Sequence, residues 1–540
     1  MQKYPDDIIL TRVGMFYEVS MEALYSPGRR TDFSRISSQS YFTQAAEVAS
    51  LLNIRLTSKS FRVRQEGKPT KRSKAASKST TPALQHKFPF AGFPISQREK
   101  FFQMLLELGR SFVVVEEKDR SEGTSKDRFV ARRYTPGTLL SEAWQISDET
   151  RHLLALSLGN NKSNGEIEDT PVGLAYIDVS TDRAVQTRTS TLGELEHELA
   201  RISPVEVVLR RGMQTYLDIG AAKPSNKTEL QGIKEISATV APLLQQSGAT
   251  IAYVDHAESS ADAIELEASA ERLIQTHLKD CLLSEMPKLL EASRQSADSF
   301  MQIDASTLLG LEIRQSLRQS VGAQAKGVYS SPASRAGTLL SVIKRTLTPS
   351  GTRLLVNTLC QPSTDLHIIT QRHDLVEAFL QRSNLREDLR YQLKQMSNAG
   401  NGEISRIIQR FSANGSTAPG LAGALAGGRD LWDLKQRIQA IDRLGQTIQE
   451  TLDNEADSTA GPYLRLRELV GGMKNLEAWV ADIDRAVVAS VLDKSAVTLG
   501  EQPDTESITG EEESDDLPAT SNQSSQENDN DRSSWWIDPK

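Results

Sequence analysis

The residues in this sequence with the clearest chemical potential are an aromatic ring and a carboxylate two positions apart, Phe16 and Glu18. They stand in the stretch RVGMFYE, residues 12–18, whose β-branched and aromatic residues are typical of a short strand. In a strand Phe16 and Glu18 share one face and Tyr17 takes the other. Such a ring can wedge between stacked bases while the carboxylate accepts a hydrogen bond from a displaced base. An ordinary half-buried strand would carry the same residues.

A folded scaffold has to position this strand, and the length and composition of the chain are those of a folded protein. The chain has 540 residues, with 38% hydrophobic and 25% charged residues, which indicates a globular protein of about three or four domains. No apolar run approaches the ~20 residues of a membrane span, so we expect no membrane partner. The two cysteines, Cys281 and Cys360, are too few for a disulfide framework and fit a reducing compartment. His277 lies one helical turn before Cys281, but two ligands do not make a zinc site, so we expect ordinary helix surface or core there.

Charge is distributed unevenly around the net value of −8. Residues 1–140 hold 24 Lys and Arg against 14 Asp and Glu, whereas residues 501–540 hold 2 against 12. A basic amino-terminal module suits a polyanion such as DNA. Eight of the 24 basic residues lie within residues 62–87, however, so a solvated basic tract explains much of the excess equally well.

Five short motifs, in their order and spacing, resemble the mismatch-binding domain of the MutS family; they occupy residues 14–18, 51–57, 89–94, 113–117 and 132–138. The resemblance implies that Phe16 stacks on a mispaired base from the minor groove and that Glu18 bonds to that base. Phe16 should then be exposed, with Glu18 on the same side. Arg12, Lys59, Arg132 and Arg133 are candidates for phosphate contacts, which position DNA without reading its sequence, or are plain surface residues.

The resemblance implies an α/β mismatch-binding domain over residues 1–140, interrupted by insertions at residues 19–39 and 62–86. Removing the first insertion joins Glu18 to an amphipathic helix start at Ser40, so we hypothesise a gene-model artefact, with a lineage-specific loop as the alternative. The second insertion is rich in Lys, Ser, Thr and Pro and is predicted to be disordered.

A second α/β domain is expected over residues 148–258, beginning with an apolar strand at residues 172–181. It resembles the family's connector domain, which has a ribonuclease-H-like core. A structure-specific nuclease is therefore one alternative function. That reading needs several carboxylates to hold two metal ions, and the sequence shows no such set around Asp178.

Residues 262–494 show helical periodicity and resemble an incomplete form of the family's all-α lever, or core, domain. We expect residues 262–400 to be helical. Thr348-Pro349 is expected to end one helix and Gly351 to open the next. The apolar spacing predicts six buried side chains: Leu311, Ile313, Leu339, Ile343, Leu354 and Leu355.

Residues 495–540 are predicted to be an acidic, disordered linker towards a clamp that this chain does not contain. Trp535-Trp536-Ile537 resembles the segment that opens the clamp in fungal mitochondrial-type members, which implies a mitochondrial location, or otherwise a nuclear one. No presequence is visible before the first motif.

The family's motor is a P-loop ATPase, and the motif G-x-x-x-x-G-K-[ST] is absent from this sequence. We therefore expect no cofactor and no catalytic motif in this chain, with ATP and Mg bound only by the ATPase domain of a full-length member. The implied partners are double-stranded DNA with mismatches or small loops and, for the full-length protein, a second copy. A structural or meiotic MutS-like scaffold that does not read mismatches is the alternative without enzymatic activity.

Overall fold

The computed structural model describes most of the chain up to residue 486. It divides into two compact units, one of Met1–Ile369 with Ile408–Ala422 and one of Thr370–Ile407 with Gly423–Lys540. The expected insertions lie almost wholly outside the described residues, and the expected acidic tail lies wholly outside them. The described residues are 4, 7–19, 38–62, 85–117, 128–140, 150–159, 167–214, 229–255, 263–283, 286–314, 316, 337–398, 403–413, 428–454, 463–473 and 475–486.

The first sheet has six strands in the order β3-β4-β2-β1-β5-β6. Strand β1 pairs in parallel with β5, and all other neighbours pair antiparallel. The helices of this part are α1 (Ser38–Leu51) and α2 (Arg98–Glu107). Its strands are β1 (Ile8–Val13), β2 (Phe16–Val19), β3 (Thr57–Arg62), β4 (Gln85–Pro94), β5 (Phe112–Glu117) and β6 (Arg128–Tyr134).

The stretch predicted to be one strand is a hairpin. Strand β1 ends at Val13, strand β2 begins at Phe16, and these two residues pair across a two-residue turn. Gly14 opens this turn with a φ of +61°, a conformation that favours glycine and that tight hairpin turns require. The single expected strand was therefore wrong, because Gly14 reverses the chain.

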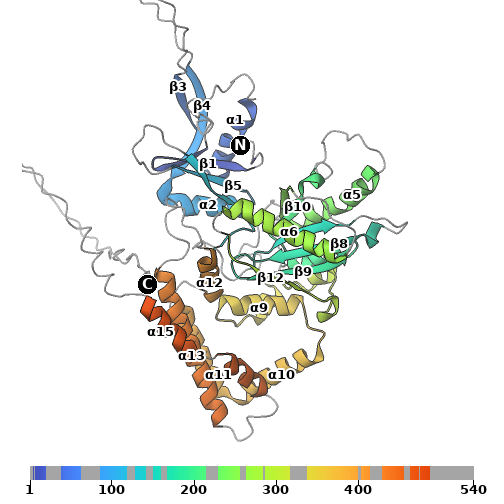
Figure 1. Cartoon of the computed structure of the whole chain (residues 1–540), viewed down its shortest axis with the longest axis vertical. Helices are drawn as coiled ribbons and strands as arrows, with labels where there is room; N and C mark the ends of the chain where they lie inside the picture. Colours follow the sequence, from blue (N-terminus) through green and yellow to red (C-terminus); the bar gives the residue numbers. More distant parts are fainter. Residues whose placement is uncertain are drawn as a thin grey trace, which may run out of the picture. The chain divides into compact units, whose positions relative to one another are not determined.

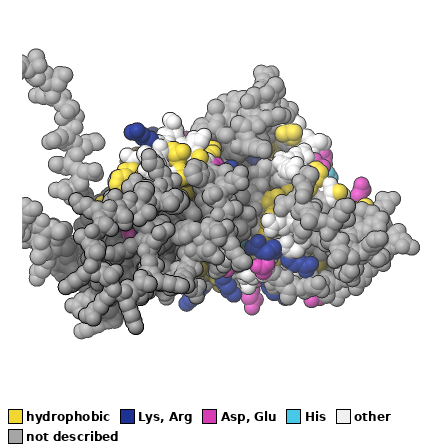
Figure 2. Space-filling model, turned by 90° about the horizontal axis from the view of Figure 1, so that it is seen from above, with side chains coloured by type: hydrophobic (Ala, Val, Ile, Leu, Met, Phe, Trp, Pro, Cys, Tyr) yellow, Lys and Arg dark blue, Asp and Glu magenta, His cyan; other side chains and the backbone are white. Residues whose placement is uncertain are grey.

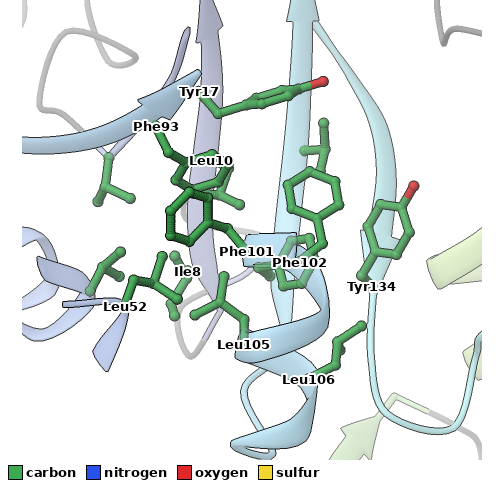
Figure 3. Close-up of a cluster of buried hydrophobic side chains, with 14 of the residues drawn as sticks. Ile8, Leu10, Tyr17, Leu52, Phe93, Phe101, Phe102, Leu105, Leu106 and Tyr134 are labelled. Carbon is green, nitrogen blue, oxygen red and sulfur yellow. The ribbon is translucent and has the colours of Figure 1, made fainter. Parts of the chain in front are cut away.

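The core of this domain is aromatic and joins the sheet to α2. Phe102 of α2 lies among Tyr17, Phe112 and Tyr134, with ring centroids 5.5, 4.7 and 5.4 Å away. Figure 3 shows Tyr17, Phe102 and Tyr134 together with Phe93 and aliphatic residues of the same cluster. This packing anchors the β1–β2 hairpin, since Tyr17 lies only one residue from its tip.

The second sheet also has six strands, in the order β11-β10-β7-β8-β9-β12. Strands β7, β8 and β9 form an antiparallel meander, and β10 pairs in parallel with both β7 and β11. Its strands are β7 (Leu153–Leu158), β8 (Pro171–Ile177), β9 (Ala184–Thr191), β10 (Glu206–Arg210), β11 (Thr250–Val254) and β12 (Leu290–Arg294).

Helices lie on both faces of this sheet (Figure 1). On one face, α3 (Leu195–Ile202) and α5 (Glu229–Ser247) share a core cluster with side chains of β7, β8 and β10. On the other face, α6 (Ala263–Leu282) crosses β8 so closely that a Cβ on Gly173 would lie 2.4 Å from the backbone of Leu266. Glycine at residue 173 is therefore required for this contact.

The boundary between the second sheet and the helical region differs from the expectation. Helix α6 packs on the sheet, and residues 290–294 form strand β12, which pairs with β9. The expectation that residues 262–400 are helical was therefore wrong for β12. Sequence periodicity identifies a helix such as α6 but does not tell which surface covers it.

Short capped helices follow in the first unit. Asp304 caps α7 (Ala305–Gly310), and Thr338 caps α8 (Leu339–Ile343). Thr348 caps α9 (Pro349–Cys360), accepting a hydrogen bond from the Gly351 amide at 3.2 Å. Thr348, Pro349 and Gly351 thus all belong to the start of one helix, in place of the expected end of one and start of another.

The apolar side chains predicted to be buried in this region are mostly exposed. The prediction is confirmed for Ile313, which is buried, and only in part for Leu355, which is half-buried. The prediction was wrong for four side chains that are exposed; they are Leu311, Leu339, Ile343 and Leu354, the last 66% exposed. Periodicity marks an apolar stripe but not the presence of a partner for it.

The second unit is all α in its described part. Its core joins buried side chains such as Ala378, Leu385 and Leu452, and Ile438 is buried as well. No helix among the described residues is both long and apolar enough to cross a membrane. Its helices are α10 (Leu366–Gln381), α11 (Ser383–Asn398), α12 (Ile404–Ala413), α13 (Gly428–Asp453), α14 (Leu464–Gly472) and α15 (Leu476–Ala486), with α10 and α12 shared with the first unit.

Candidate nucleic-acid interface

The tip of the β1–β2 hairpin exposes two large apolar side chains. Met15 is 70% exposed and Phe16 is 47% exposed. The backbone of the tip is held from the β4 side, since the Ile95 amide donates to the Met15 carbonyl at 3.0 Å. An apolar pair on a fixed backbone can enter a step between stacked bases, and the predicted exposure of Phe16 is confirmed.

Tyr17 points the opposite way and is 2% exposed. Its ring packs near Phe93 and Phe102, with centroids 6.1 and 5.5 Å away. Its hydroxyl leaves the apolar cluster (Figure 3) and donates to the Glu116 carboxylate at 2.5 Å. The alternation expected from the sequence, with Phe16 outside and Tyr17 inside, is therefore confirmed.

Glu18, which is expected on the same side of the strand as Phe16, is only 7% exposed. It pairs across the sheet with Gly92. A Cβ at Gly92 would lie 3.1 Å from the Glu18 Cγ and 2.7 Å from the Tyr17 carbonyl oxygen. Glycine at residue 92 thus leaves space for the Glu18 side chain, which lies over β4.

Arg12 is committed to an ion pair. Its Nη1 donates to the Glu116 carboxylate at 3.1 Å, and its Nε donates to the Gly14 carbonyl at 3.4 Å. The hydrogen bond to Glu116 raises the pKa of Arg12 above its ordinary value. The guanidinium thus braces the turn, and its assignment as a phosphate contact stays a prediction.

Arg132 and Arg133 are used inside the protein. Arg132 is 2% exposed, lies 4.5 Å over the Tyr134 ring and donates to the Thr138 carbonyl at 3.1 Å. Arg133 forms two hydrogen bonds to the Asp7 carboxylate, at 2.6 and 3.1 Å. Both guanidinium groups are thus engaged by internal partners, and their assignment as phosphate contacts stays a prediction.

Lys59 lies in β3, but its side chain is outside the described residues. Among the described side chains drawn in Figure 2, a few of Lys and Arg occur next to those of Asp and Glu, and none of them forms a continuous basic group.

A buried ionic joint links the first sheet, the second sheet and α6. The Glu206 carboxylate of β10 accepts hydrogen bonds from the Thr135 hydroxyl at 2.6 Å and the Gly137 amide at 2.8 Å. It also lies 2.9 Å from His277 Nε2, and both side chains are fully buried. On the same helix, Cys281 Sγ lies 3.7 Å from the Arg133 Nη1 atom. Residues 135–138 form a turn, in which the Thr138 amide donates to the Thr135 carbonyl at 3.2 Å, and this turn contacts the Glu206 carboxylate.

Electrostatics favours the charged form of this joint. Burial alone lowers the pKa of His277, but Cys281 and Glu206 outweigh burial and raise it to about 10. Burial raises the pKa of Glu206, and His277, Thr135 and Gly137 together bring it below its ordinary value. The expectation of plain surface or core at residues 277 and 281 missed the long-range partner Glu206.

Asp178, the residue considered for a nuclease site, caps a turn. Its carboxylate accepts hydrogen bonds from the Ser180 amide and hydroxyl at 3.0 and 2.7 Å and from the Arg151 amide at 3.0 Å. Within the described residues, no group of three or more His, Cys, Asp or Glu side chains could hold a metal ion.

Two family models match this sequence: MutS domain I over residues 38–143 and MutS domain III over residues 306–508. The chain belongs to the MutS family. The Phe16 hairpin precedes the domain I match, but β2 pairs with β4 and β1 with β5, and both partners lie inside it. The hairpin is therefore part of the MutS domain I sheet.

Curated relatives agree with this membership. The chain is 29% identical over 384 residues to the DNA mismatch repair protein MutS of Nitrobacter hamburgensis, covering 69% of this chain and 38% of the relative. It is 28% identical over 385 residues to that of Rhodopseudomonas palustris strain HaA2, covering 70% of this chain and 38% of the relative. The chain thus spans well under half the length of these MutS relatives.

The sequence did not single out Met15 or Glu116. Met15 is next to Phe16, and its place in the turn became apparent only with the hairpin. Glu116 lies within one of the MutS-like motifs, but nothing in its local sequence gives its distance to Tyr17 and Arg12. Burial of Arg132 had a local signal, because Arg132 and Tyr134 are two residues apart and share a strand face.

Proposed function

We propose that this chain carries the mismatch-recognition part of a DNA mismatch-repair protein, with Phe16 as the wedge at the mispaired base. The observation that supports this most is an exposed aromatic at the tip of a braced hairpin in a MutS domain I sheet. A mispair has already lost pairing energy, so kinking DNA there costs less than kinking matched DNA. The ring can then gain stacking energy of roughly 1–3 kcal/mol.

Glu18 is proposed to accept a hydrogen bond from the displaced base. Because it is 7% exposed, its carboxylate has to become accessible when DNA binds. Glu18→Ala should weaken discrimination less cleanly than Phe16→Ala, since removing a carboxylate near phosphates also relieves repulsion and raises binding to matched DNA. Lys59 remains a proposed phosphate contact.

The wider architecture is proposed from family resemblance. The second sheet is proposed to be the connector domain with a ribonuclease-H-like core, which the β7–β9 meander followed by parallel β10 and β11 supports. The helical region corresponds to an incomplete lever. A full-length protein is proposed to act as a homodimer on mismatched duplexes, with ATP and Mg bound in a separate ATPase domain, in the mitochondrion or otherwise in the nucleus.

Competition binding tests the proposed function. Wild-type chain and Phe16→Ala are compared on matched and mismatched duplexes of the same length at one salt concentration. Phe16→Ala should lose a preference of about tenfold to a hundredfold while keeping most salt-sensitive duplex binding. An equal loss on both duplexes would make Phe16 a structural residue and favour the scaffold alternative.

A further inference from the structure

One buried carboxylate, that of Glu116, accepts hydrogen bonds from both strands of the Phe16 hairpin, and these bonds are called the grip below. Glu116 is 2% exposed and lies on β5. Its Oε2 accepts from Arg12 Nη1 at 3.1 Å, and its Oε1 accepts from the Tyr17 hydroxyl at 2.5 Å. Arg12 is on β1 and Tyr17 is on β2, so both oxygens of one side chain are bound to opposite strands.

The sheet register places this grip directly beneath the tip. Arg12 and Tyr17 are cross-strand partners, and the next pair is Val13 with Phe16, which closes the turn. Thr11 pairs with Val115 on β5, so Glu116 is in register with Arg12. The three side chains therefore form one row across β2, β1 and β5, immediately before the exposed end.

The chemistry of the row keeps these bonds in place. Burial and the Glu116 carboxylate both raise the pKa of Tyr17, so its hydroxyl remains protonated and able to donate. Arg12 is ionised and only partly exposed, with 35% of its side chain accessible. Hydrogen bonds to a charged acceptor are stronger than those between neutral groups. The Arg12 guanidinium extends the grip to the turn through the Gly14 carbonyl, which it contacts at 3.4 Å.

We propose that Glu116 is a positioning residue for the mismatch wedge. By fixing the Arg12–Tyr17 pair it orders the Met15–Phe16 tip before DNA arrives. The stacking energy of Phe16 is then not offset by the entropy of ordering a mobile hairpin at the moment of binding. The inference rests on the proposed function, because it assigns Glu116 a part in the action of Phe16.

Two conservative substitutions test this inference in the full chain. Tyr17→Phe removes one hydroxyl and keeps the ring in the core, and Glu116→Gln keeps the shape of the side chain and removes its charge. The matched control is Glu198→Gln, since Glu198 is also buried and pairs with two cations, Arg188 at 3.2 Å and Arg201 at 2.6 Å.

The first readout needs no DNA. A nitroxide label is attached at Met15→Cys, and its mobility is measured by electron paramagnetic resonance; unmodified chain gives the blank, because both native cysteines are buried. Tyr17→Phe and Glu116→Gln should each increase label mobility, whereas Glu198→Gln should not. Equal mobility in all variants, or an equal increase in the control, would overturn the proposal.

The second readout is the ratio of mismatched to matched duplex binding in the unlabelled chain. Tyr17→Phe and Glu116→Gln should each lower this ratio by about tenfold with little change in matched binding, as expected for one hydrogen bond to a charged group. A mobile label with an unchanged ratio would also overturn the positioning role. If the wild-type chain shows no preference, the proposed function fails, while the mobility experiment still decides whether Glu116 holds the tip.

Discussion

The hairpin tip and the joint around Glu206 both depend on a buried carboxylate, yet the residues next to the first are exposed and those next to the second are buried. At the tip, Glu116 binds donors from two strands and the apolar residues beyond them stay exposed. At the joint, Glu206 binds donors from the 135–138 turn and from α6, and Thr135, Glu206 and His277 are all fully buried. A buried carboxylate thus supports an exposed hairpin tip in the case of Glu116 and links two sheets in the case of Glu206.

This comparison explains why a count of basic residues misleads. Arg12 pairs with Glu116 beneath the tip, and Arg133 contacts both Asp7 and Cys281 near the joint, so both basic side chains have internal partners. Some basic residues of the amino-terminal module are therefore neutralised by internal ion pairs, and their number alone does not indicate a DNA-binding surface. Substitutions at the joint and at the tip should change the free energy of unfolding by very different amounts, and a substitution of Arg133 should hardly change the salt dependence of DNA binding.

The largest effect is expected at the joint. Glu206→Leu leaves the protonated His277 buried without its partner, so it should lower the free energy of unfolding by about 3–5 kcal/mol. Urea denaturation followed by circular dichroism measures the change. The control is Glu47→Leu, which breaks an exposed pair with Arg110 and should cost less than ~1 kcal/mol. A joint variant as stable as this control would contradict the account.

A dependence on pH should follow from the same pair. The folded pKa of His277, about 10, lies above its ordinary value of 6.5. Its contribution to stability is therefore complete below pH 6.5 and is lost as the pH rises towards 10. Glu206 has a lowered pKa, so its contribution is present above about 4.5 and is lost on acidification. Unfolding measured from pH 6 to 10 should show a fall that His277→Gln reduces; an unchanged slope in that variant would assign the fall to other groups.

The tip should tolerate truncation. Phe16→Ala removes a side chain that is 47% exposed, so we expect a loss of less than ~1 kcal/mol in unfolding free energy. Phe102→Ala, in the aromatic core behind the same hairpin, should cost ~3–5 kcal/mol. Comparable losses for the two variants would mean that Phe16 has a structural role, and the contrast between tip and core would disappear.

The smallest effect on DNA binding is expected for Arg133. Because its guanidinium is paired with Asp7, Arg133→Gln should leave the slope of log K against log salt for duplex binding essentially unchanged. A true phosphate contact would reduce that slope by about one. Titrations of matched duplex at several salt concentrations measure the slope, and a reduction near one would restore Arg133 as a DNA contact.

The order of strands and helices could be predicted well from local patterns. The strand expected at residues 172–181 lies at β8, and helices α6, α9 and α13 lie within residues 262–494, where helical periodicity placed them. The hairpin was missed because a glycine inside an apolar run can either continue a strand or reverse it, and only the pairing with β4 and β5 decides.

Burial and ion pairing were less predictable because they depend on partners far along the chain. Leu354 lies on a clear apolar pattern, yet it is 66% exposed, so Leu354→Ala should cost far less than the ~2–5 kcal/mol of a core position. Glu116 and Tyr17 are 99 positions apart, and Glu206 and His277 come from different elements. Local sequence contains no signal that either pair of side chains is in contact.

The central claim, that Phe16 meets the mispaired base, is tested most directly by photo-crosslinking. Phe16 is replaced by p-azido-phenylalanine in the full chain, with the same substitution at Tyr391, an exposed aromatic of α11, as the control. Illuminated complexes with a single-mismatch duplex should give crosslinks from residue 16 that map to the mispaired base or its neighbour, and matched duplex or residue 391 should give few. Crosslinks from residue 16 spread evenly along matched and mismatched DNA, or none at all, would contradict the account.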